Sequence, residues 1–250
     1  MRADQLLVER GLASSRSQAQ RLIAAGVRWF DGAAWKPVAK NGDEVPLAAQ
    51  VELLDTAESR YVSRGGLKLD GALRTAVLDV RGWTCLDVGQ STGGFTDCLL
   101  QHGAARVTGV DVGHGQLHEK LRREPRVVAI EKLNARELSA EHVGGDFDLV
   151  TGDLSFISLT LVLPALVPLL KIDGHLMLLA KPQFELQPGQ VGKGGVVRDP
   201  ALYVLVEQRL RDACAGLGLT VRGWYDSPIA GGDGNREFFL HAQRSDGCFP

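Results

Sequence analysis

A glycine-rich stretch, "LDVGQSTGGFTD" at residues 86–97, joins an apolar run to a helix-like pattern. Its glycines, Gly89, Gly93 and Gly94, allow a ligand to approach the backbone without obstruction by a Cβ atom. Their spacing differs from the dinucleotide-binding pattern G-x-G-x-x-G, and no G-K-[ST] follows. The stretch therefore favours a small-molecule site other than one for a nicotinamide cofactor or a nucleoside triphosphate.

Two acids belong to the same predicted site. Asp111 ends the next predicted strand, where its carboxylate can accept hydrogen bonds from both hydroxyls of a ribose. Asp87 can meet the cationic amino end of a methionine-like ligand, directly or through water. The combination predicts S-adenosylmethionine as the cofactor, although the glycine loop alone also fits a structural turn. The predicted cofactor-binding residues are Asp87, Gly89, Ser91, Gly93, Asp111 and, near the adenine, Asn134.

Charged side chains also stand at the ends of predicted strands. Asp153 ends "DFDLVTGD", Lys181 closes "HLMLLAK", and Glu237 begins the last strand in "NREFFLHA". Lys68 follows the paired glycines of "SRGGLKL". The carboxyl edge of a doubly wound sheet is its functional edge, which favours a shared site. Taken singly, such a lysine also fits a side chain reaching out of the core, and such an acid fits the surface.

The elements that would position these residues alternate between strands and helices. After residue 66, apolar strands such as "WTCLDVG", "ARVTGVDV" and "DFDLVTGD" are separated by helical patterns such as "GGFTDCLLQHG". This order predicts an α/β fold with a mostly parallel sheet and helices on both faces. Two closing strands, "LTVRGWYDS" and "NREFFLHAQ", are expected to form an antiparallel edge.

The first quarter of the chain has a different pattern, which predicts a small α+β domain at residues 1–57. It shows a helix ending at Gly11, a second helix capped by serine, a strand at residues 27–30 and a turn at Asp31-Gly32. Residues 1–40 hold seven Lys or Arg against three acids, while the whole chain has a net charge of −2. This asymmetry fits a polyanion-binding module, or merely a solvated basic surface. Residues 58–66 are the predicted linker and residues 67–250 the second domain.

Composition excludes several classes of protein. No apolar run reaches the roughly 20 residues of a membrane-spanning helix, and the start lacks a secretory signal, so a cytoplasmic protein without membrane contact is expected. The four cysteines form no C-x-x-C pair, and His114 and His118 have no third ligand candidate nearby. No metal site is therefore predicted.

The N-terminal stretch "RADQLLVERGLASSRSQAQRLIAAGVRWFDG" resembles the αL RNA-binding module of a small-subunit ribosomal protein. In that family a helix pair carries arginines to the phosphate backbone, for which the forked guanidinium is suited. The resemblance makes Arg16 and Arg21 the leading candidates, and Arg10 and Arg28 further ones. The predicted RNA-binding residues are Arg2, Arg16, Arg21, Arg60 and Arg64.

The whole chain is similar to the TlyA (haemolysin A) family, which joins that module to an FtsJ-like methyltransferase domain. The resemblance rests on "RYVSRGGLKL", "TGGFTDCLLQ", "DVGHGQL", "DLSFISL", "KPQFE" and "GNREFFLH". It implies a Rossmann-like class I methyltransferase fold and 2′-O-methylation of cytidines in ribosomal RNA of the small subunit, the large subunit or both. Ribosomal RNA or ribosomal subunits would be the partner. The resemblance also implies a catalytic tetrad, formed by Lys68, Asp153, Lys181 and Glu237.

In that tetrad Lys181 would face the ribose hydroxyl, as a general base if neutral or as a cation that stabilises an oxyanion. Lys68 would supply a like charge, and the two acids would orient the lysines and the ribose. Gln90 replaces a small residue of many relatives and is expected to narrow the methionine end of the pocket or to add a hydrogen bond there. A catalytically silent RNA-binding protein is the alternative, with a haemolysin a weaker one, and the oligomeric state stays open.

Overall fold

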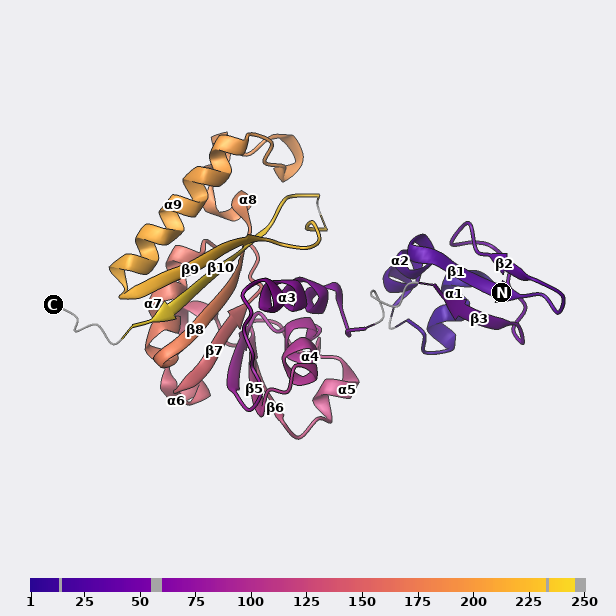
Figure 1. Ribbon diagram of the computed structural model, residues 1–250, viewed down its shortest axis with the longest axis horizontal. Helices are drawn as coiled ribbons and strands as arrows, with labels where there is room; N and C mark the ends of the chain where they lie inside the picture. Colours follow the sequence, from indigo (N-terminus) through magenta and orange to yellow (C-terminus); the bar gives the residue numbers. More distant parts are fainter. Residues whose placement is uncertain (14, 55–59, 233, 246–250) are drawn as a thin grey trace. The chain divides into compact units, whose positions relative to one another are not determined.

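The computed structural model describes residues 1–13, 15–54, 60–232 and 234–245, in two units, Met1–Leu67 and Lys68–Pro250 (Figure 1). In the smaller unit two helices pack against a three-stranded antiparallel sheet of order β2-β1-β3. Ser15 caps the second helix by accepting a hydrogen bond from the Gln18 amide. The elements are α1 (Ala3–Glu9), α2 (Arg16–Gly26), β1 (Val27–Phe30), β2 (Trp35–Pro37) and β3 (Gln50–Leu53).

The described part of the predicted linker 58–66 is not a free connection. Helix α3 (Arg64–Thr75) begins within it, and Tyr61 is buried. A Cβ atom at Gly66 would lie 2.3 Å from the Tyr61 ring, so this glycine permits close packing rather than flexibility. Residues 58 and 59 lie outside the described residues.

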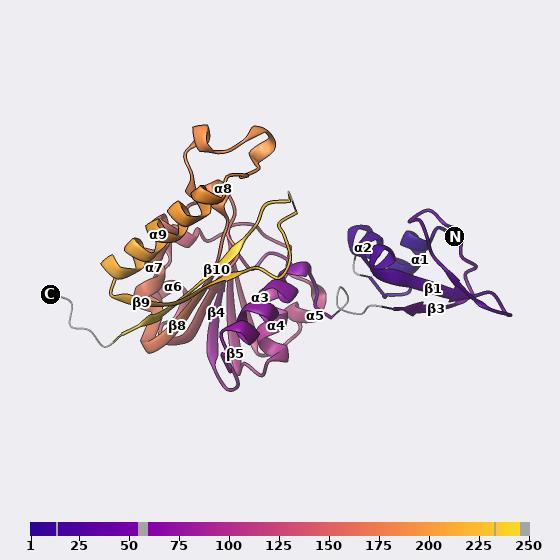
Figure 2. The ribbon, with the colours of Figure 1, turned by 45° about the horizontal axis from the view of Figure 1, so that its top comes forward.

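The larger unit is built on a seven-stranded sheet of order β6-β5-β4-β7-β8-β10-β9. Helices cover both faces, with α3 and α4 on one and α7 and α9 on the other (Figure 2). The strands are β4 (Thr84–Val88), β5 (Arg106–Asp111), β6 (Val127–Glu131), β7 (Phe147–Gly152), β8 (Leu170–Ala180), β9 (Leu219–Asp226) and β10 (Phe238–Arg244). The α-helices after α3 are α4 (Gly94–Gln101), α5 (Glu119–Arg122), α6 (Ala140–Val143), α7 (Leu163–Leu166), α8 (Pro182–Glu185) and α9 (Pro200–Gly216).

The two closing strands form the expected antiparallel edge. β10 runs antiparallel to both of its neighbours and lies between β8 and β9, so β9 is the outermost strand and has the direction of the parallel strands. Successive side chains of β10 pack alternately on the two faces of the sheet. Phe238 and Leu240 belong to the core beneath α7 and α9, and Phe239 stacks on Phe95 of α4.

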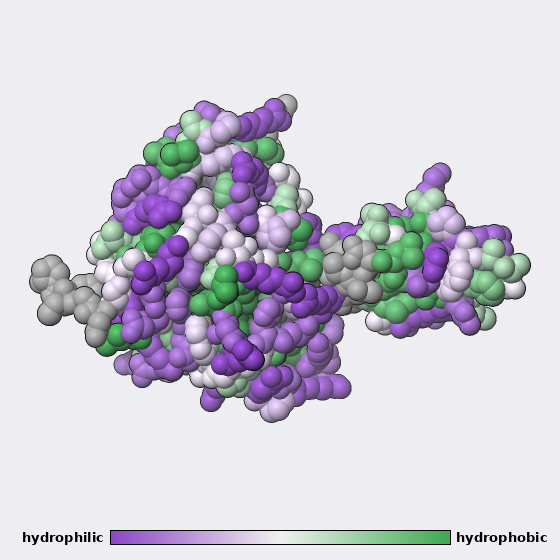
Figure 3. Space-filling model, in the orientation of Figure 1, coloured by the Kyte–Doolittle hydropathy of each residue, from purple (hydrophilic) through white to green (hydrophobic). Residues whose placement is uncertain are grey.

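The surface and the core of the larger unit are clearly separated. The side chains of Leu86, Val150, Leu178 and Leu240, from four neighbouring strands, are fully buried. Hydrophilic side chains with smaller hydrophobic groups between them cover the face of this unit drawn in Figure 3. Among the described residues no helix has the length and the apolar character needed to cross a membrane.

Candidate active site

A cavity of about 530 Å³ opens where the parallel strands β4, β5 and β7 end. Four of the six predicted cofactor-binding residues line it, together with apolar side chains that include Val112, Leu133 and Ile157. Those four residues are Gly89, Ser91, Asp111 and Asn134. The predicted glycine loop therefore does form one wall of a ligand-sized cavity.

Asp111 is held rigidly at the centre of this wall. One carboxylate oxygen accepts a hydrogen bond from the Ser91 amide at 2.7 Å, and the other accepts from the Gly113 amide at 2.7 Å. Ser91 in turn donates its hydroxyl to Gln116, a lining residue that sequence reasoning missed. A carboxylate oxygen has lone pairs left after one such bond, so Asp111 can also accept from the two hydroxyls of a ribose.

The loop after β4 comes very close to the segment after β7. A Cβ atom at Gly89 would lie 2.7 Å from the carbonyl oxygen of Asp153, and Gly89 has a φ of 80°. Only glycine adopts this conformation at this separation without strain. Gly93 does not line the cavity. A Cβ atom there would clash with Leu117 and Leu121, so this glycine allows those side chains to pack against the loop.

The predicted contact of Asp87 with the cofactor, direct or through water, stays a prediction. The side chain of Asp87 is buried, accepts a hydrogen bond from the Thr96 hydroxyl at 2.6 Å, and does not line the cavity. Gln90 is also buried and donates to Thr96 at 2.9 Å, so the expectation that it narrows the pocket is wrong. Burial raises the pKa of Asp87 to about 7, against the hydrogen bonds from Thr96, which lower it.

Asn134 lies on the lining after β6 but is exposed, and its side-chain oxygen accepts from the Arg136 amide. The adjoining side chains of Leu133 and Val112 also line the cavity, and their apolar character suits the face of an adenine ring. A fixed acid for ribose hydroxyls, an apolar end and a close backbone approach at Gly89 together fit S-adenosylmethionine.

The four predicted catalytic residues form two ion pairs. Lys68 Nζ lies 2.6 Å from Glu237 Oε2, with both side chains at most 10% exposed. Lys181 Nζ lies 2.7 Å from Asp153 Oδ1. Lys181 also donates to the Ser155 hydroxyl at 2.9 Å. Asp153 and Ser155 line the cofactor cavity, so the second pair stands on its rim.

The strand register brings the two pairs to the same edge. Phe238 of β10 pairs with Ala180 of β8, so Glu237 and Lys181 occupy the next facing positions, where strands are about 4.8 Å apart. Asp153 follows Gly152, which pairs with Leu178 of β8. The predicted tetrad is thus assembled from α3, β7, β8 and β10.

Glu185 fastens the two segments that carry Lys181 and Asp153, and sequence reasoning missed it. Its buried carboxylate accepts from the Ser158 hydroxyl at 2.5 Å and from the Leu159 amide at 2.7 Å. Glu185 ends α8, which directly follows Lys181, whereas Ser158 belongs to the loop after Asp153. The only sequence signal was its place in "KPQFE", where a lone acid is normally exposed.

Phe156 is a second missed residue. It lines the cavity, is 91% exposed and has a φ of 63°, a left-handed conformation that a bulky side chain seldom adopts. Its ring lies 5.1 Å from that of Phe184. The fold therefore presents an aromatic face to solvent beside the cavity.

The predicted RNA-binding arginines differ in their surroundings. Arg2 and Arg16 each lie 3.0 Å from the fully buried carboxylate of Asp4, and about half of each arginine side chain stays exposed. The hydrogen bond from Arg2, aided by Arg16, holds the pKa of Asp4 well below its usual range. Asp4 therefore fixes the orientation of both guanidinium groups.

The other predicted arginines have individual settings. Arg28 pairs with Glu52 at 2.6 Å, and Arg10 donates to backbone carbonyls of residues 47 and 49. Arg21 is half-buried on α2, Arg64 opens α3, and the Arg60 guanidinium lies 5.1 Å from the Tyr61 ring centre. As RNA contacts, all of these arginines stay predictions.

Comparison with known proteins decides the family. The model of FtsJ-like methyltransferases matches residues 61–244, and the S4 domain model matches residues 1–26. A Mycobacterium tuberculosis protein, 16S/23S rRNA (cytidine-2′-O)-methyltransferase TlyA, is 48% identical over 239 residues, 96% of this chain and 88% of that protein. The chain belongs to the TlyA family.

Other relatives agree with this placement. Hemolysin A of Brachyspira hyodysenteriae is 38% identical over 96% of this chain and 99% of its own. A solved structure from Streptococcus thermophilus, 39% identical, matches with a TM-score of 0.76 over 98% of this chain and 89% of that one. The predicted class I methyltransferase fold and the N-terminal RNA-binding module, an S4 domain, are confirmed. As an FtsJ-like methyltransferase of the TlyA family, the chain uses S-adenosylmethionine.

The buried acid gives the first testable prediction. Between pH 4 and pH 7 the folded protein retains a proton on Asp87 that the unfolded chain, with a carboxyl pKa of about 3.9, has lost. This residue's contribution to stability therefore falls as pH rises. In cofactor-free protein, Asp87→Asn should gain stability relative to wild type by up to about 1.4 kcal/mol per pH unit in this window. Urea unfolding at pH 5, 6 and 7 measures it. If the free energies of unfolding of the two proteins changed with pH in the same way, the raised pKa of Asp87 would be contradicted.

The buried side chain of Glu185 gives the second testable prediction. Glu185→Ala should lower kcat for methyl transfer about 10–100-fold, because the Lys181 and Asp153 segments lose their common anchor. Glu185→Gln keeps an acceptor for the Leu159 amide and should restore part of the rate. S-adenosylmethionine affinity, measured by calorimetry, should change little in either variant. Equal rates for the alanine and wild-type proteins would remove Glu185 from a positioning role.

Proposed function

We propose that this protein transfers the methyl group of S-adenosylmethionine to the ribose 2′-hydroxyl of cytidines in ribosomal RNA. The observation that carries the proposal is the place of Asp153, which lines the cofactor cavity and also binds Lys181 at 2.7 Å. A charged lysine at this rim is suited to a hydroxyl nucleophile. The substrate is supported by the 48% identical TlyA relative, whose name specifies cytidine in 16S and 23S rRNA.

Lys181 is positioned to hold the 2′-oxygen. A protonated lysine has three N–H donors, and two of them are directed to Asp153 and Ser155. The third can donate to the 2′-oxygen and stabilise the negative charge that develops as the hydroxyl proton passes to solvent water. The sulfonium of the bound cofactor supplies an already activated methyl group. Alignment of that methyl with the oxygen therefore contributes much of the rate.

The other ion pair supports this arrangement. Lys68 and Glu237 are nearly buried and neutralise each other, which avoids an unpaired charge beside the site. Glu237 faces the position of Lys181 across the β8–β10 register. We assign Lys68 and Glu237 to orienting the ribose and Lys181, and Asp153 to orienting Lys181 directly.

The exposed Phe156 ring suits the base of the target nucleotide. A ribose 2′-hydroxyl inside a duplex cannot enter a cavity, so the nucleotide must be presented unstacked. An aromatic face replaces part of the stacking that is lost, with about 1–3 kcal/mol per base in single-strand-binding proteins. Phe156 is the exposed aromatic on the cavity lining and is assigned this role.

The S4 domain is assigned to RNA affinity. Arg2 and Arg16, oriented by Asp4, keep exposed guanidinium edges that can each contact a phosphate. Arg21, Arg60 and Arg64 are proposed as further contacts. Because its substrate is ribosomal RNA, the protein is proposed to act in the cytoplasm, on ribosomal subunits.

The third prediction tests the activity directly. Purified 30S and 50S subunits are incubated with protein and methyl-labelled S-adenosylmethionine, and the label is mapped by the resistance of 2′-O-methylated positions to alkaline hydrolysis. Lys181→Ala should lower the rate at least about 100-fold. Its matched control is Lys171→Ala, since Lys171 lies at the start of β8, the strand that Lys181 follows, and pairs with an acid of β7, Asp148, at 2.7 Å. The control should keep the wild-type rate.

Each result separates the alternatives. Label on a base instead of a ribose would overturn the proposed reaction. Wild-type protein that binds S-adenosylmethionine but labels neither subunit nor free rRNA would favour the catalytically silent RNA-binding protein. Near-normal turnover by Lys181→Ala would remove that lysine from the catalytic role. Leakage of liposomes caused by the purified protein would favour the haemolysin, which the name of the Brachyspira relative suggests.

A further inference from the structure

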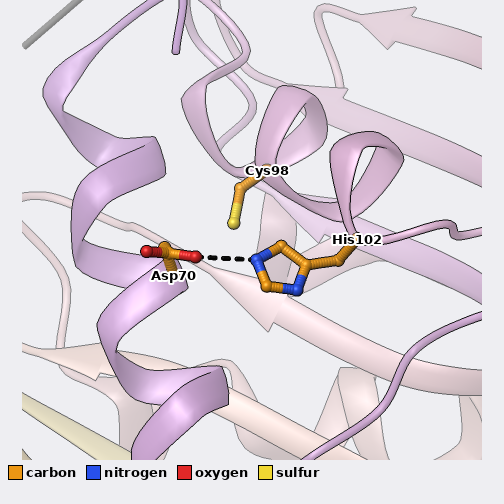
Figure 4. Close-up of side chains that lie close together, drawn as sticks. All are labelled: Asp70, Cys98 and His102. Carbon is orange, nitrogen blue, oxygen red and sulfur yellow. Dashed lines mark hydrogen bonds and ion pairs between the residues drawn. The ribbon is translucent and has the colours of Figure 1, made fainter. Parts of the chain in front are cut away.

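Three side chains with different metal-binding atoms meet between α3 and α4. Asp70 comes from α3, and Cys98 and His102 stand four residues apart at the end of α4, so they share one helix face. His102 Nε2 lies 2.7 Å from Asp70 Oδ1. All three side chains point into the same space between the two helices (Figure 4). Their ligand atoms all lie within 4.8 Å of one another.

None of the three lines the cofactor cavity, and none belongs to the tetrad. Cys98 is fully buried, and the Asp70 side chain is 11% exposed. The charged group facing Asp70 from its own helix is Arg74, whose Nε lies 3.1 Å from Asp70 Oδ2. Arg74 is 63% exposed, so its guanidinium can turn into solvent at low cost if another cation takes its place.

We propose that Asp70, Cys98 and His102 form a binding site for a divalent zinc ion. Zinc favours tetrahedral sites made of thiolate sulfur, imidazole nitrogen and carboxylate oxygen, with bonds of about 2.0–2.3 Å. Atoms bound this way lie roughly 3–4 Å apart, so ligand atoms within 4.8 Å need only side-chain adjustment. Three protein ligands leave the fourth position to water.

The chemistry of binding follows from the protonation of the ligands. Cys98 releases its thiol proton to solvent and binds as a thiolate, and His102 Nε2 binds through the lone pair of a neutral imidazole. Asp70 exchanges its contacts with Arg74 and His102 for the metal. The site then carries two negative ligand charges against the two positive charges of the ion, which makes the buried group neutral.

An ion can reach this place from solvent. His102 lines a surface hollow of about 470 Å³, together with Arg74, Asp79 and Arg81. The carboxylate of Asp79 is paired with Arg81 at 2.5 Å, which offsets one of the two arginine charges in the hollow. The hollow gives a hydrated cation a path from solvent to His102.

The fourth prediction is a spectroscopic test on the full-length protein. After dialysis against EDTA and removal of the chelator, Co²⁺ is titrated as a probe for zinc. Thiolate-bound cobalt gives an intense ultraviolet charge-transfer band and visible d–d bands typical of tetrahedral coordination. Added Zn²⁺ should abolish both. Affinity for Zn²⁺ is measured by competition with a chromogenic chelator, and in Cys98→Ser it should fall by about 100-fold or more. Loss of a residue that only supports a metal ligand already costs about 10–100-fold in affinity.

Two more variants complete the test. Cys214→Ser is the matched control, because Cys214 is also a fully buried cysteine on a helix, and it should keep the cobalt spectrum. His102→Ala, at the more exposed end of the cluster, should lose the d–d bands even if Cys98→Ser fails to fold by circular dichroism. The proposal is overturned if wild type shows no thiolate band, if the thiolate band persists in Cys98→Ser, or if the tetrahedral d–d bands persist in His102→Ala.

Discussion

The antiparallel pairing of β10 with β8 is the constraint on which the rest of the site depends. In a parallel sheet only the residues that follow a strand reach the carboxyl edge, as Asp153 and Lys181 do. β10 runs in the opposite direction, so the residue that precedes it, Glu237, arrives at that same edge. Insertion of this strand between β8 and β9 therefore provides an acid from a segment more than fifty residues beyond Lys181. Without the reversal, Glu237 would stand at the opposite end of the sheet from Lys68.

Burial of charge is managed differently on the two sides of this edge. Around the tetrad, each lysine has its own acid, so the cluster is neutral and can be nearly enclosed. On the cofactor side, burial and, to a smaller extent, the negative charges of Asp153 and Asp111 raise the pKa of Asp87 to about 7. Asp111 and Asp153 line the cavity, so a cationic cofactor is the natural complement to their charges.

The sequence was sufficient for residues whose place follows from strand ends. Asp153, Lys181 and Asp111 could be located because each closes an apolar run, and Gly89 because it directly follows the predicted strand in a glycine-rich loop. Asp87 lies on the predicted strand, but being on the right strand does not settle whether a side chain faces the ligand or the core. The order of β9 and β10 depends on long-range pairing that local patterns do not contain. Glu185 was missed because its positioning role depends on hydrogen bonds from Ser158 and Leu159, which are far away in sequence.

Neither unit of the chain carries a large net positive charge that would attract RNA as a whole. Seven lysines and arginines are balanced by seven acids in residues 1–57, and the catalytic unit, residues 68–250, has 19 lysines and arginines against 22 acids. Its lysines at the site are paired with acids and contribute little free positive charge. Affinity for a phosphate backbone must then come from individual exposed arginines, such as Arg2 and Arg16 of the S4 module, which share the single carboxylate of Asp4. Neutral pairing at the catalytic edge therefore leaves the phosphate contacts to groups outside the tetrad.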